Sequence, residues 1–167
     1  MNISIRAISF FMLLAAALTS CTKQRSDTLA DNRPLVPVTV QNAIDYRPDP
    51  TVGTSRTGGG AIQIILTIPA SSGRSIKEIT KVAANTSYTQ IQGTGTTGFY
   101  NTAPIPGNGT TVTFTTSLTE YFVKKPITAS NAAAASNTEL GNRFYFLLTL
   151  DDGSVIVTEP VRVLVLD

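Results

Sequence analysis

Carboxylates are the side chains of this sequence best suited to chemistry, because they bind hard cations and act as acids or bases. Asp151 and Asp152 are adjacent, and Gly153 follows them. Clustered oxygens could hold calcium, but Asp-Gly is also a favoured hairpin turn, and we favour the turn. The other acids have no calcium-loop spacing. The sequence therefore predicts no metal site.

Nucleophilic catalysis needs a base beside the nucleophile, and the sequence contains no histidine. Ser71, Ser72 and Gly73 look like part of a nucleophile turn, but only a serine–lysine pair could activate such a serine. Residues 93–98 read Gly-Thr-Gly-Thr-Thr-Gly, superficially like a dinucleotide loop, without the apolar helix that must follow. We expect loops at both places, no cofactor and no catalytic residue. A histidine-free hydrolase is the least favoured alternative.

Phe99 and Tyr100 lie in a glycine-rich stretch, residues 93–109. Exposed in a loop, the two rings would suit the face of a sugar or an apolar patch on a partner. Folded inward, they would close the end of the core, which is the commoner outcome for such a pair. A loop this long is uncommon in a compact domain unless it is functional or disordered. Phe99 and Tyr100 are therefore the candidate ligand or partner contact.

Cys21 is the only cysteine, and it follows a segment typical of secretory signals. Arg6 precedes an apolar run over residues 7–18, which is shorter than the roughly 20 residues that span a bilayer. Residues 18–21, Leu-Thr-Ser-Cys, resemble the lipobox of bacterial lipoproteins. The resemblance implies cleavage after residue 20, lipid on Cys21 and a membrane as partner through that lipid.

The residues after Cys21 indicate in which membrane such a lipoprotein is anchored. Thr22 stands where inner-membrane lipoproteins of enteric bacteria carry Asp, which favours the outer membrane. Lys23 and Arg25 do not fit the acidic pattern that accompanies export to the cell surface in other Gram-negative groups. The resemblance thus implies a cell-envelope protein, most simply an outer-membrane lipoprotein, whose periplasmic or surface orientation stays open.

The composition is that of one folded domain, which would follow the lipidated Cys21 in the chain. Hydrophobic residues make up 42% and charged residues 14%, too apolar for a disordered chain. The formal charge is +2 with no basic stripe, so nucleic acid is not an expected partner. We divide the 167 residues into a signal peptide (1–20), a lipidated cysteine with a polar tether (21–34) and a domain (35–167).

Short β-branched runs between glycine and proline breaks predict strands. They cover residues 35–40, 61–68, 75–84, 88–92, 111–118 and 144–150, followed by a return strand over 155–158 and 161–166 that is broken at Pro160. Residues 45–60 and 93–109 are predicted loops, Asp152-Gly153 a two-residue hairpin turn, and 131–140 a short helix. About seven strands in this length predict an all-β Greek-key sandwich.

The closing segment, residues 142–167, resembles the last hairpin of immunoglobulin-like and fibronectin type III-like modules. The cysteines and tryptophan of antibody domains are absent, and Leu140 stands six residues before Phe146 where the fibronectin pattern has tyrosine. Because the sequence shows no nucleophile–base pair, metal cluster or phosphate loop but does show an anchor and a tether, we expect a non-catalytic module that binds an envelope protein or a glycan. The alternative is a structural or assembly subunit of a larger envelope complex.

Overall fold

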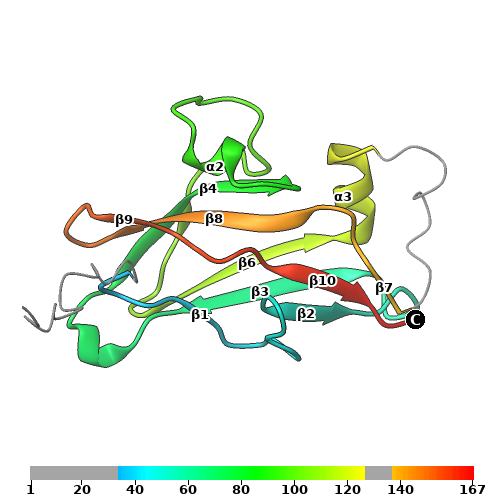
Figure 1. The fold of residues 1–167 in the computed structure, drawn as a ribbon, viewed down its shortest axis with the longest axis horizontal. Helices are drawn as coiled ribbons and strands as arrows, with labels where there is room; N and C mark the ends of the chain where they lie inside the picture. Colours follow the sequence, from blue (N-terminus) through cyan, green and yellow to red (C-terminus); the bar gives the residue numbers. More distant parts are fainter. Residues whose placement is uncertain (1–33, 127–136) are drawn as a thin grey trace, which may run out of the picture. The chain divides into compact units, whose positions relative to one another are not determined.

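Strands whose inward side chains are apolar face each other across the core. β6 (Thr111–Ser117) and β8 (Arg143–Leu150) point every second side chain inward, because successive residues of a strand lie on opposite faces. The computed structural model describes residues 34–126 and 137–167 and shows the expected all-β sandwich (Figure 1). Cys21 and the rest of residues 1–33 lie outside the described residues.

Ten strands among the described residues form three sheets. The other eight strands are β1 (Thr39–Val40), β2 (Thr51–Thr54), β3 (Ala61–Thr67), β4 (Ile76–Asn85), β5 (Ile105–Pro106), β7 (Thr138–Glu139), β9 (Val155–Val157) and β10 (Arg162–Val165). The sheet orders are β1-β3-β6, β2-β10-β7 and β5-β4-β8-β9. All neighbours are antiparallel except β2 and β10, which are parallel.

The inner faces of these sheets share one hydrophobic core. Apolar side chains of β3 and β6 on one side and β4 and β8 on the other belong to a single buried cluster. β2 and β10 add Val52, Val163 and Val165 to this cluster. Phe144 of β8 exchanges backbone hydrogen bonds of 2.9 and 2.8 Å with Val161, just before β10. These two bonds tie the sheet of β8 to the start of β10.

Two segments have a secondary structure other than the one predicted from the sequence. Residues 45–60 were expected to be a loop, yet they contain β2, which pairs with β10 more than 100 residues later. Residues 88–92 were expected to be a strand, yet Thr89–Gln92 is the helix α2. Tyr88 and Ile91, three residues apart, turn to the same side and pack beside Tyr145.

The helix α3 (Leu118–Lys124) begins at Leu118, which the sequence analysis assigned to the end of a strand. Ser117 caps it, because its hydroxyl accepts a 3.1 Å hydrogen bond from the backbone N–H of Glu120. Thr138–Glu139 of the predicted helix 131–140 is instead the strand β7, and residues 131–136 lie outside the described residues.

In the part of the chain that the structure describes, no helix has the length and apolar character to cross a membrane.

The β8–β9 hairpin is confirmed, with a loop one residue longer than expected. Leu150 N–H donates to the Ser154 carbonyl at 2.9 Å, and Gly153 N–H donates to the Leu150 carbonyl at 3.1 Å. These bonds enclose three loop residues rather than two. Gly153 has φ +83°, a left-handed conformation that a three-residue hairpin loop needs at its last position.

Gly107 shows that a glycine of the 93–109 stretch serves the fold. It follows β5, and its N–H donates a 2.8 Å hydrogen bond to the carbonyl of Lys77 in β4. A Cβ atom on Gly107 would lie 2.0 Å from the carbonyl oxygen of Ile76. The backbones of β4 and of residue 107 can be this close only because residue 107 has no side chain.

Gly107→Ala should therefore lower the free energy of unfolding by about 2 kcal/mol or more, because the backbone beside β4 must move to admit a methyl group. Gly95→Ala is the matched control, since a Cβ there would contact nothing within 4 Å. Its stability should stay within about 0.5 kcal/mol of the wild type. Chemical denaturation of both variants measures the difference, and equal midpoints would contradict the close approach.

Candidate functional site

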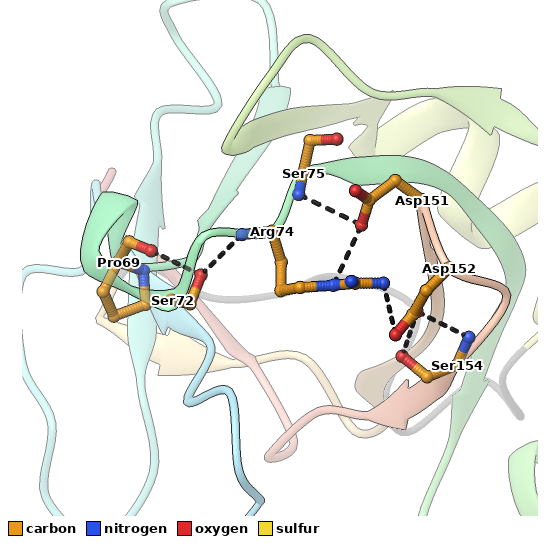
Figure 2. A network of polar contacts seen from close by, with 7 residues as sticks. All are labelled: Pro69, Ser72, Arg74, Ser75, Asp151, Asp152 and Ser154. Carbon is orange, nitrogen blue, oxygen red and sulfur yellow. Dashed lines mark hydrogen bonds and ion pairs between the residues drawn. The ribbon is translucent and has the colours of Figure 1, made fainter.

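Asp151 and Asp152, the calcium candidates of the sequence, bind an arginine in the structure (Figure 2). Arg74 Nε lies 3.1 Å from Oδ1 of Asp151, and Arg74 Nη2 pairs with Oδ2 of Asp152. These are ion pairs without well-aligned hydrogen bonds. Asp151 Oδ1 also accepts from Ser75 N–H at 3.3 Å, and Asp152 Oδ1 accepts from Ser154 N–H at 2.9 Å. The two carboxylates thus join the β3–β4 turn to the β8–β9 loop.

The hydroxyl of Ser72, in the Ser71-Ser72-Gly73 turn, is hydrogen-bonded within the turn. The Ser72 hydroxyl donates to the Pro69 carbonyl at 2.6 Å and accepts from Arg74 N–H at 3.3 Å (Figure 2). Gly73 ends this 3-10 turn with φ +65°. A hydroxyl that donates to a carbonyl has no base to activate it. Within residues 34–126 and 137–167, no three Asp, Glu or Cys side chains gather as metal ligands.

Phe99 and Tyr100, the predicted contact pair, point to opposite sides of the sheet. Tyr100 is 3% exposed, with its ring centroid 5.3 Å from that of Phe144 and 5.8 Å from that of Phe114. Its hydroxyl shares a 2.7 Å hydrogen bond with the hydroxyl of Thr116. Burial raises the pKa of Tyr100 to about 12. Tyr100 is thus part of the core, which is the inward alternative, and is not exposed to a partner.

Helix α3 holds Tyr100 from the solvent side. Lys124 Nζ donates to the Tyr100 carbonyl at 2.7 Å and lies 4.5 Å from the centroid of its ring. The same ammonium pairs with Glu120 Oε1 at 2.7 Å, and this hydrogen bond lowers the pKa of Glu120. Glu120 Oε2 accepts from the Thr116 hydroxyl at 2.9 Å. These contacts hold Lys124, Glu120 and Thr116 around the buried ring of Tyr100.

Phe99 lies on the outer side of the sheet, at the wall of a shallow pocket. Its ring is half-buried against a second small cluster that contains Ala83, Ile91 and Tyr145. The pocket has a volume of about 160 Å³. Its lining residues, from β4 and the loop that covers it, are Thr80, Lys81, Thr96, Phe99, Asn101, Thr102, Ala103 and Pro104. Only Phe99 of the predicted contact pair therefore reaches a surface where a ligand could bind.

Asn101 fixes the shape of this pocket. Its Oδ1 accepts from the N–H of Val82 at 2.7 Å, and its Nδ2 donates to the carbonyls of Thr80 and Ala103 at 3.2 and 2.9 Å. Both amide hydrogens and one lone pair of the amide oxygen are thus used by backbone groups. No sequence signal singled out this residue, because an isolated Asn in a glycine-rich stretch looks like any turn residue.

Lys81 supplies the positive charge of the pocket. Its Nζ lies 4.8 Å from the Phe99 ring centroid and donates to the Gly95 carbonyl at 3.0 Å. The lining thus offers an ammonium, the hydroxyls of three threonines and one aromatic ring, and no carboxylate. This set suits a small polar group with a flat apolar face, such as a sugar ring. Alternation along β4 could not have indicated Lys81, because the register of β4 shifts between Ile79 and Lys81 and so breaks the period of two.

Tyr100→Ala should lower the free energy of unfolding by about 3 to 5 kcal/mol, as truncation of a core aromatic does. Phe99→Ala should cost about 1 to 2 kcal/mol, because its ring is only partly buried. Tyr100→Phe keeps the ring and removes one hydrogen bond, so it should cost about 1 kcal/mol. Denaturant unfolding of the three variants compares them. A Tyr100→Ala variant as stable as Phe99→Ala would contradict the core position of Tyr100.

Comparison with known proteins gives no match to a family model, to a curated protein or to a solved structure. The function of the chain must therefore be inferred from its own residues and their geometry.

Proposed function

We propose that this chain is a membrane-anchored, non-catalytic lipoprotein of the cell envelope, most simply of the outer membrane, whose immunoglobulin-like module binds a glycan or a partner protein. The observation that carries the proposal is the Leu-Thr-Ser-Cys sequence of residues 18–21 directly after an apolar run of signal-peptide length. Acyl chains on Cys21 would exceed the two-signal requirement for stable anchoring.

The spacing between anchor and module supports this arrangement. The compact unit begins at Pro34, and twelve residues separate it from Cys21. These residues are mostly polar and could span at most about 40 Å when extended, or about 20 Å on average as a flexible chain. The module would thus stay within reach of molecules close to the membrane surface.

Strand order supports the immunoglobulin-like assignment. Immunoglobulin constant domains place strands A, B and E on one sheet and C, F and G on the other. Here β1, β3 and β6 form one sheet, and β4, β8 and β9 lie side by side in another. The correspondence A–β1, B–β3, C–β4, E–β6, F–β8 and G–β9 keeps the chain order, with β5 beside β4 as an additional edge strand.

The Phe99 pocket supports the binding role and indicates a glycan as the first ligand class to test. Its hydroxyls and ammonium match the hydroxyl groups of a sugar, and the half-buried ring offers an apolar face. The assembly role is the second candidate. It is favoured by the apolar strand β9, whose Val155 is 62% exposed at the end of its sheet.

Cys21→Ser should abolish incorporation of a fatty-acid analogue, because serine has no thiol to receive the lipid. The variant should also keep its leader or leave the membrane fraction. Metabolic labelling followed by mass measurement of the full chain checks both results. Label incorporated equally into wild type and variant would refute the anchor.

Phe99→Ala should weaken glycan binding by about tenfold or more, the usual cost of losing one stacking ring. Tyr46→Ala is a control, since Tyr46 is a 52% exposed aromatic that does not line the pocket. Binding of the full-length protein to envelope oligosaccharides, measured by saturation-transfer NMR, tests this. Equal affinity of Phe99→Ala and wild type would exclude the Phe99 pocket as the glycan site.

A further inference from the structure

β9 is an end strand with one side unpaired. It pairs only with β8. Backbone hydrogen bonds join residue 150 of β8 to residue 154, and residue 146 of β8 to residue 158, at the two ends of β9. Hydrogen-bonded and non-hydrogen-bonded pairs alternate along an antiparallel ladder. The N–H and C=O groups of Val155 and Val157 therefore point away from β8. Among the described residues, no backbone hydrogen bond reaches them from that side.

Apart from its short length of three residues, this edge lacks the features that keep exposed strands apart. Soluble proteins protect edge strands with charged side chains, proline or bulges. Residues 153–158 read Gly-Ser-Val-Ile-Val-Thr, with no charge and no proline. Val155 is 62% exposed, and Val157 is partly exposed. A strand of this kind is suited to pairing with another strand.

The sequence of the edge indicates which strand it fits. Residues 154–158, Ser-Val-Ile-Val-Thr, are almost the same when read backwards. A two-fold axis beside Ile156 would place Val155 opposite Val157 of a second copy, and Ser154 opposite Thr158. We infer that the free edge of β9 pairs with the same edge of a second copy of this chain.

This pairing satisfies the exposed backbone groups. Residues that face each other in a hydrogen-bonded antiparallel pair exchange two N–H···O bonds. Val155 opposite Val157 occurs twice about the two-fold axis, so four hydrogen bonds form. The sheet β5-β4-β8-β9 then continues into the same sheet of the second copy. Such a self-complementary patch is the interface type that closed two-fold dimers use.

Charge and shape both permit the pairing. The charged residues nearest in sequence are Asp152 and Glu159, which lie outside the paired residues 154–158, and Asp152 forms an ion pair with Arg74. Beside the edge lies an apolar groove of about 300 Å³, between β9, Leu150 and residues 34–36. Ile156 lines this groove, and Leu35 beside it is fully exposed. Ile156 of each copy would meet its equivalent there and shield the groove from water.

Cysteine cross-linking in intact membranes tests the register. One tagged full-length copy carries Val155→Cys, and a second, differently tagged copy carries Val157→Cys. Facing residues in a hydrogen-bonded pair have Cα atoms about 5.5 Å apart, a distance that a disulfide spans. Oxidation should give at least about tenfold more mixed-tag dimer than the control pair of Val155→Cys with Val123→Cys. Val123 is 75% exposed on α3, far from β9 in sequence. Equal yields would overturn the proposal.

A charge substitution tests the dimer independently of cysteine chemistry. Val155→Lys should raise the dimer dissociation constant about tenfold or more, because it places two ammonium groups in the paired edge. Val123→Lys is the matched control and should leave the dimer intact. Sedimentation equilibrium of the detergent-solubilised full-length protein measures both. A monomeric wild type, or a dimer unchanged by Val155→Lys, would overturn the inference.

Two other occupants give distinct results in these measurements. If β9 bound an extended segment of another protein, Val155→Cys would cross-link to that protein, and the mixed-tag dimer would be absent. If the edge contacted lipid, both cysteine pairs would cross-link equally little and the solubilised protein would be monomeric. Either result contradicts self-pairing. Neither depends on the Phe99 pocket or on labelling of Cys21, so the lipid anchor and the glycan site are tested separately from self-pairing.

Discussion

The burial of Phe144 is the interaction on which the rest of the structure depends. Its ring lies 5.3 to 6.4 Å, centroid to centroid, from four other aromatic rings. These rings come from the 93–109 stretch, β6, α3 and β8 itself, and they are Tyr100, Phe114, Tyr121 and Phe146. The backbone of Phe144 also binds Val161, which leads into β10. One residue thus connects both faces of the sandwich, the pocket loop and the last strand.

Local alternation explains which parts of the fold could be predicted from the sequence. β6 and β8 alternate clearly, so their faces and the hairpin after β8 could be recognised without knowledge of their partners. β2 could not, because a four-residue strand containing Gly53 is stabilised by parallel pairing with β10 at the other end of the chain. α3 did have a local signal, since Ser117 and Glu120 have the spacing of a helix cap.

The candidate site was predictable only in part, for a reason seen at Phe99 and Tyr100. Adjacent residues in extended chain point to opposite sides, so one ring of such a pair enters the core while the other stays outside. The backbone N–H of Tyr100 donates a 2.7 Å hydrogen bond to the carbonyl of Val82 in β4. This long-range bond sets which of the two rings enters the core. Asn101 then holds the loop on β4 through three backbone groups. Neither contact has a signature in the local sequence.

The pocket and the free edge belong to the same sheet, and this relates the two proposals. The pocket lies against the outer face of β4, and β9 is the end strand of that sheet. A two-fold axis between antiparallel edges is perpendicular to the sheet, so the outer faces of both copies would point the same way. Two Phe99 pockets would then share one surface. A repeating glycan that occupied both would bind its second site intramolecularly, with a gain in avidity that does not need new contacts. A pocket of about 160 Å³ covers little of a sugar chain, so the proposed glycan site would gain most from a second site supplied by pairing through β9.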